Sequence, residues 1–212
     1  SLSGQYRMLQ QALDGVLLDS RVYLPASVEE NLIARRIAAL KSTADGQRFA
    51  WIEAQSDAEI RSALDLIERH QLKAALIGPR QLKPFVDRLK QLNVAVVVPA
   101  IEPTTYNWFS ADIAAASEAG VTVMFAGETA EQLRVSAALS GLSPEAALVA
   151  LCDPLSKLDG RVGSLTAEQP ADFVVWTESP VHLSARPLAV VVDGQRASTA
   201  KAASNQLAAD KD

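Results

Sequence analysis

Hydrophobic residues in the middle of the chain alternate between short unbroken runs and segments with helical spacing. The short runs are Phe49–Ile52, Leu72–Ile77, Val94–Val98 and Val121–Phe125. Between them, apolar residues recur every three or four positions, which predicts amphipathic helices. Unbroken apolar strands that alternate with helices are typical of a parallel sheet with right-handed crossovers. The pattern predicts four βα units, which is half of an eight-fold barrel or enough for a small open sheet.

Capping and turn residues divide the rest of the chain. Ser56 or Asp57 is expected to cap the helix that follows the first strand, and a later helix is expected from about Ser110 to Ala119. After a helix at Pro144–Leu151, glycine and proline separate shorter segments that we interpret as strands. We therefore predict a helical segment at 1–46, a partial βα barrel at 47–158, a β segment at 159–195 and a flexible tail at 196–212.

Composition and charge limit the classes of function. Hydrophobic residues make up 49% of the chain and aromatic residues only 5%, so the core must be mainly aliphatic. The net charge of −5 argues against a nucleic-acid partner, because phosphate binding needs a clustered basic surface. We expect no membrane span and no signal peptide, since neither a long apolar run nor a charged leader is visible. The compartment stays open, with the cytoplasm as the default expectation. The single cysteine, Cys152, is expected to be buried and inert.

The order of several short segments resembles the amidohydrolase superfamily, and within it the imidazolonepropionase-like metal-dependent hydrolases. These segments are Gly-Val-Thr-Val at 120–123, Gly-Leu-Ser-Pro-Glu-Ala-Ala-Leu at 141–148, Gly-Arg-Val-Gly-Ser-Leu at 160–165, Pro-Ala-Asp-Phe-Val-Val-Trp at 170–176 and Val-Asp-Gly at 192–194. The resemblance covers roughly 47–195. It implies an α/β fold with the C-terminal half of a (β/α)8 barrel and a small β segment of an accessory β-sandwich domain. It also implies hydrolysis of C–N bonds other than peptide bonds, with zinc or another divalent metal as cofactor.

The resemblance also implies where the metal ligands of such a half-barrel would lie. The family has a His after the first of these strands, a second His after the next and an Asp after the last. Glu53 stands in the first position, Ile77-Gly78-Pro79 offers no donor at the second, and Glu128 replaces the Asp at the third. Glu53 and Glu128 are therefore the candidate catalytic residues, and no residue is assigned as a metal ligand. Alternatively, Glu128 lies in the first turn of a helix and interacts with its dipole.

The sequence offers weaker support for a functional role of the other candidate residues. His70, at a helix end, is expected to be solvated, and His182 is expected in a loop, so neither lies at a strand end. No Gly-x-Ser-x-Gly elbow or phosphate-binding loop occurs. Thr105, Tyr106 and Trp108 belong to a polar and aromatic loop that is expected at the barrel mouth, where they are candidate substrate-binding residues. The alternative is a loop that folds onto its own aromatic side chains.

Three functional readings remain open. The chain is an amidohydrolase-related pseudoenzyme that is non-catalytic alone, or a working cyclic amidohydrolase completed by a missing N-terminal half or partner chain. The third reading is a small-molecule binding module on an open α/β sheet. A half-barrel would leave two open strand edges and an apolar inner face, both unfavourable in water. We therefore expect association with an N-terminal half-barrel or with a second copy of the chain.

Overall fold

The computed structural model describes residues 9–11, 13–14, 38–101, 106–152, 167 and 171–199, without the side chains of 106–109 and 198–199. The chain divides into two compact units. Unit 1 comprises Ser1–Pro99 and Asp112–Met124, and unit 2 comprises Ala100–Ala111 and Phe125–Asp212. The predicted segment 158–165 and most of the predicted N-terminal helices lie outside the described residues. None of the helices that the structure describes has the length and apolar character needed to span a bilayer.

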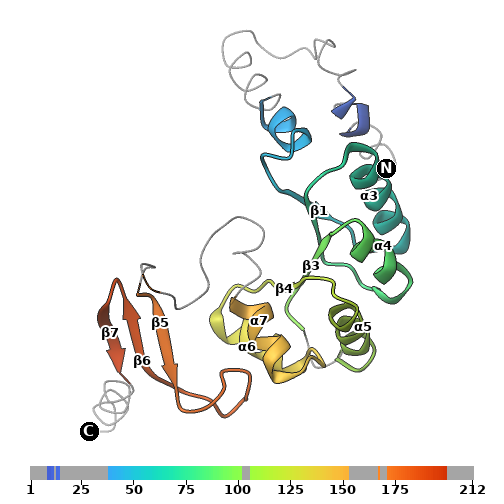
Figure 1. The fold of residues 1–212 in the computed structure, drawn as a ribbon. Coiled ribbons are helices and arrows are strands. Elements are labelled where there is room, and N and C mark those ends of the chain that lie inside the picture. The colour runs from blue at the N-terminus through green and yellow to red at the C-terminus, as the bar shows by residue number, and fades with distance from the viewer. Residues whose placement is uncertain are drawn as a thin grey trace, which may run out of the picture. The chain divides into compact units, whose positions relative to one another are not determined.

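A four-stranded sheet with the order β1-β2-β3-β4 confirms the predicted alternation of strands and helices (Figure 1). β1 pairs with β2, and β2 with β3, in parallel. The strands are β1 (Ala50–Glu53), β2 (Ala74–Ile77), β3 (Ala95–Val98) and β4 (Val123–Phe125). The intervening helices are α3 (Asp57–His70), the 3-10 turn η2 (Lys83–Phe85), α4 (Val86–Gln91) and α5 (Tyr106–Glu118). The chain thus has a mixed α/β fold with a parallel sheet.

Helix α3 begins at the predicted cap. The Ser56 side chain accepts from the Glu59 backbone N–H, and the Glu59 carboxylate accepts from the Ser56 backbone N–H, which forms a capping box. The predicted apolar stripe of Ile60, Leu64 and Ile67 is buried. The helix ends at His70, and the left-handed backbone of the capping residue Gln71 turns the chain toward β2.

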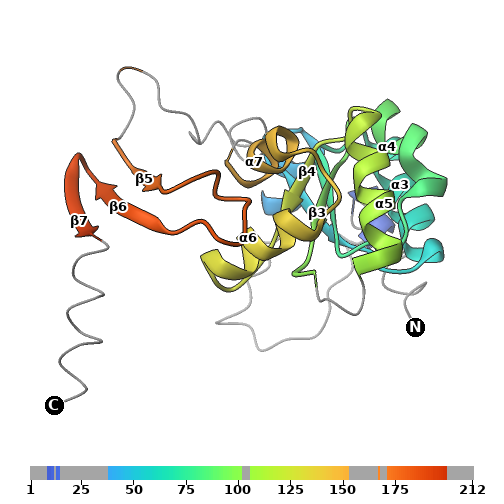
Figure 2. The ribbon, with the colours of Figure 1, turned by 90° about the horizontal axis from the view of Figure 1, so that it is seen from below.

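The two faces of the sheet differ in how they are covered. Helices α3 and α4 lie on one side of the strands in both views (Figures 1 and 2). The parallel register places Leu76 beside Val96 on one face, and both are fully buried. Ala75 and Ala95 share the opposite face and are also buried, whereas their neighbour Trp51 on β1 is 48% exposed. On this face, the exposed residues of β1–β3 that the structure describes are Trp51 and Glu53, both on the edge strand β1.

Unit 2 has a small core between two short helices. These are α6 (Ala130–Leu139), which begins at a Thr129 cap, and α7 (Pro144–Cys152). Ala137, Ala147 and Val181 are buried together. Gly141, between the helices, has a φ of +77°, and a Cβ there would lie 3.0 Å from the Ser110 carbonyl oxygen. Only glycine fits this turn without strain.

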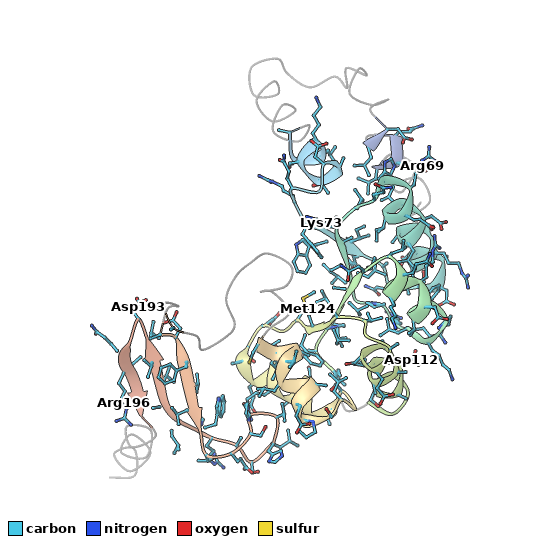
Figure 3. All side chains as sticks on the ribbon, in the orientation of Figure 1. Arg69, Lys73, Asp112, Met124, Asp193 and Arg196 are labelled. Carbon is cyan, nitrogen blue, oxygen red and sulfur yellow. The ribbon has the colours of Figure 1, made fainter. Side chains whose placement is uncertain are left out.

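The end of the described chain forms a three-stranded antiparallel sheet with the order β5-β6-β7. The strands are β5 (Phe173–Trp176), β6 (Pro187–Val192) and β7 (Gln195–Thr199). Asp193 and Gly194 have φ values of 50° and 74°, which fit a two-residue type I′ hairpin turn. The Asp193 backbone N–H donates to Asp172 at 2.7 Å, and Figure 3 labels Asp193 at this turn. No strand side chain of this sheet that the structure describes is buried.

Three sequence expectations are wrong. Helix α5 begins at Tyr106 rather than Ser110, because no glycine or proline stops it from starting earlier. Residues 196–199 belong to β7 rather than to a tail, since the tight turn at Gly194 returns the polar segment to pair with β6. Cys152 is exposed, because the buried side of α7 consists of Ala147 and Ala150.

Candidate functional site

A hydrogen-bonded polar group lies at the carboxyl ends of β1 and β2 in unit 1. The Gln55 side-chain amide donates from Nε2 to Glu53 Oε1 at 3.0 Å, and its Oε1 accepts from Arg80 Nη2 at 3.1 Å. These two contacts fix the orientation of the amide, because its nitrogen faces a carboxylate and its oxygen faces a guanidinium. A carboxylate and a guanidinium are thus held on either side of one amide.

The backbone around this group is held by both neighbouring elements. The Gln55 N–H donates to Glu59 Oε2 at 2.6 Å, and the Gln55 carbonyl accepts from the Arg80 N–H at 3.0 Å. Gly78, between β2 and Arg80, has a φ of +74° and donates to the Val97 carbonyl at 3.0 Å. The hydrogen bonds from the Ser56 and Gln55 backbones lower the pKa of Glu59 below its usual value. The network therefore holds Gln55 and Arg80 in place before any ligand arrives.

Glu128, the second candidate catalytic residue, lies in a different unit from Glu53. It is exposed and precedes the Thr129 cap of α6, and its backbone N–H donates to Gln132 Oε1 at 2.8 Å. The acidic residue in the first turn of α6 is Glu131, so the alternative that placed Glu128 in that turn is wrong. Joint action of Glu53 and Glu128 stays a prediction.

The candidate substrate-binding residues were expected in a loop. Tyr106 and Trp108 lie instead in the first turns of α5, and Thr105 is outside the described residues. The loop interpretation is therefore wrong for Tyr106 and Trp108. Their role in substrate binding stays a prediction.

Neither histidine lies at a strand end. The His70 side chain is only 12% exposed, so the expectation of a solvated ring is wrong, because Asp14 Oδ1 lies against it at 3.5 Å from Nε2. His182 lies in the loop between β5 and β6, where its Nδ1 is 3.0 Å from Glu178 Oε2. The Ser184 hydroxyl donates to Glu178 rather than to His182, so these residues form no nucleophile–base pair. Hydrogen bonds from Ser184 and His182 lower the pKa of Glu178.

The donor set at the ends of β1 and β2 does not fit a catalytic metal. A catalytic zinc ion usually has three protein ligands drawn from His, Cys and carboxylates. Glu53 accepts from Gln55, Glu59 caps a helix, and Ile77-Gly78-Pro79 has no donor side chain. Across the parts of the chain that the structure describes, no three His, Cys, Asp or Glu side chains form a group that could hold a metal ion.

Sequence reasoning missed Gln55 and Arg80. Gln55 follows Glu53 by two positions, so strand alternation continued beyond the end of β1 would have placed both on one side. Arg80 follows the Gly78-Pro79 turn, and a single arginine after a turn carries no signal of its own. The hydrogen bond between the two segments becomes evident only once β1 and β2 pair.

Comparisons with solved structures identify the architecture. An amidohydrolase from Thermotoga maritima MSB8 is 16% identical and matches 93% of this chain with a TM-score of 0.66. Atrazine chlorohydrolase from Arthrobacter aurescens TC1, solved with zinc, is 18% identical and matches 96% with a TM-score of 0.56. A triazine hydrolase variant is 18% identical and matches 90% with a TM-score of 0.55. No family model matches the sequence, and no curated protein does.

These likenesses concern the fold, because the identities are low. The chain spans 54% of the Thermotoga amidohydrolase and of the triazine hydrolase variant, and 58% of the atrazine chlorohydrolase. It therefore has the fold of about half of an amidohydrolase structure.

Proposed function

We propose that this chain is an amidohydrolase-related protein that is not catalytic by itself. In this proposal the four-stranded sheet is the C-terminal half of a (β/α)8 barrel, and β5–β7 belong to an accessory β-sandwich domain. The observation that carries the proposal is the chemistry of the strand ends. Glu53 stands where the family has a metal-binding His, and it accepts from Gln55, which in turn accepts from Arg80.

The charges at these strand ends favour binding over hydrolysis. A hydrolytic site needs an activated water and a base to take its proton. Here the candidate carboxylate of unit 1, Glu53, accepts from the Gln55 amide, which in turn accepts from the Arg80 guanidinium, and Ile77-Gly78-Pro79 offers no side chain to help hold a water. Hydrogen-bonding groups at the carboxyl ends of parallel strands are also typical of ligand sites. This observation supports the binding-module reading as a second candidate function.

A hydrolysis assay with added metal tests the proposal. We expect no turnover of cyclic amides or esters by the purified chain in the presence of zinc, nickel or iron. Glu53→Gln and Glu128→Gln should then change nothing. Turnover that both variants abolish would contradict the proposal and support a working hydrolase.

We further infer that the chain associates through its open sheet surfaces. Trp51 is exposed on β1, and no described strand pairs with the outer edge of β1. Val174, Leu188 and Val192 are also exposed on the second sheet. Such edges and apolar surfaces favour pairing with another half-barrel or a second copy. Light scattering should detect a species larger than the 22.6 kDa chain, and a strict monomer at all concentrations would contradict this inference.

A further inference from the structure

One side of the edge strand β1 carries a continuous aromatic and polar stripe. Trp51 and Glu53 are alternate residues of β1 and face the same side, and Phe49 and Gln55, which flank the strand, contact them. We call these four residues the β1 stripe. The Phe49 and Trp51 ring centroids are 5.5 Å apart, and Glu53 is bonded to Gln55. The stripe therefore joins an aromatic surface to the polar group at the strand end.

The exposure of Trp51 is unusual within its unit. It is 48% exposed and, among the described residues of unit 1, the only large hydrophobic side chain that is exposed. The core of the same unit is well buried, with Leu64, Leu76 and Val96 fully inaccessible. An exposed tryptophan beside a carboxylate offers a surface for a cation, because the ring face attracts positive charge.

At the polar end of the stripe, Arg80 presents a positive charge to a ligand, opposite in sign to the charge of Glu53. Arg80 is exposed, and although its charge also acts on the Glu59 carboxylate, it forms no close salt bridge with the residues that the structure describes. Its guanidinium can bind a carboxylate with two parallel hydrogen bonds. The contacts through Gln55 place Glu53 Oε1 and Arg80 Nη2 no more than about 8 Å apart. A site with fixed and separated opposite charges selects a ligand with the complementary separation.

We propose that the β1 stripe and Arg80 bind a linear zwitterion of the ω-amino carboxylate class. Its ammonium group lies over Trp51 and donates to Glu53, which keeps accepting capacity because a carboxylate has about four acceptor positions. Its carboxylate pairs with Arg80. An aliphatic chain between the two groups crosses Gln55, whose amide both neighbours hold in place. The proposal rests on the binding-module reading of the proposed function and needs the Trp51 ring to stay accessible in any associated form. Because it involves no hydrolysis, the titration and the hydrolysis assay can fail separately.

Calorimetric titration with 6-aminohexanoate tests this proposal, with tryptophan fluorescence as a second readout. The probe has five methylene groups between its charges, whereas hexylamine and hexanoate each carry only one charge. We expect 6-aminohexanoate to bind at least about tenfold more tightly than either control ligand. Arg80→Met and Glu53→Gln should each weaken binding by about tenfold or more. Trp51→Leu should weaken binding and remove the fluorescence response.

Matched variants control for unspecific charge effects. Lys73→Met removes an exposed cation at the opposite end of the strands, and Glu118→Gln removes an exposed carboxylate at the end of α5. Both should bind like the wild type. The proposal is overturned if millimolar 6-aminohexanoate produces no heat, or if hexylamine binds equally well. It is also overturned if Arg80→Met and Glu53→Gln leave the affinity unchanged.

Discussion

Replacing Leu64 with alanine is expected to lower the free energy of unfolding by about 3 kcal/mol. Leu64 lies on the buried side of α3 and is fully inaccessible, as are Ile60 and Leu76. Leu64→Ala therefore removes a leucine side chain from a closed core and leaves a cavity that its neighbours only partly fill. The loss combines the transfer free energy of the removed carbons with the cost of the cavity.

Urea denaturation followed by circular dichroism measures this loss. Leu183→Ala is the matched control. It makes the same chemical change at the surface, because Leu183 is 64% exposed. The control should change the free energy of unfolding by less than about 0.5 kcal/mol. Equal effects of the two variants would show that α3 does not pack against the sheet as described.

Replacing Arg134 with methionine is expected to destabilise unit 2 by about 2–3 kcal/mol. Arg134 is only 8% exposed, and its Nη1 donates to the Pro180 and His182 carbonyl oxygens at 2.7 and 3.0 Å. Its guanidinium also lies 5.1 Å from the Trp176 ring centroid. Helix α6 thus holds the loop between β5 and β6, and methionine would leave the Pro180 carbonyl without this donor and the His182 carbonyl with only the Ala185 N–H.

The unfolding of unit 2 can be followed through Trp176 fluorescence in a background where Trp51 and Trp108 are replaced by phenylalanine. Arg186→Met is the matched control, since Arg186 is an exposed arginine at the end of the same loop. We expect Arg134→Met to shift the urea midpoint and to expose the loop to chymotrypsin at Leu183, whereas the control keeps wild-type stability. No difference between the two variants would contradict the role of Arg134.

Local signals predicted the fold well wherever they acted within one element. The stripe of Ile60, Leu64 and Ile67 and the cap at Ser56 are local, and both are confirmed. The exposure of Cys152 was missed because α7 is apolar on every side beyond Glu145, so its sequence does not indicate which side is buried. The partial burial of His70 depends on Asp14, more than fifty positions away, which no periodicity reveals.

The candidate site was predicted only in part for the same reason. Glu53 was found from its place at a strand end, and the structure confirms that place. Gln55 and Arg80 could not be identified as part of the site from the sequence. The pairing of β1 with β2 brings their two segments within hydrogen-bonding distance. Chemistry that depends on contacts between elements requires the three-dimensional structure.

The metal content of the purified chain tests the central claim most directly. The chain should be incubated with zinc, dialysed, and measured by elemental analysis beside a Glu53→Gln variant. We predict far less than one zinc ion per chain, with no difference between the two proteins, because the ends of β1 and β2 lack the donor set that a catalytic zinc needs. One tightly held zinc ion per chain that is lost in the Glu53→Gln variant would contradict the account.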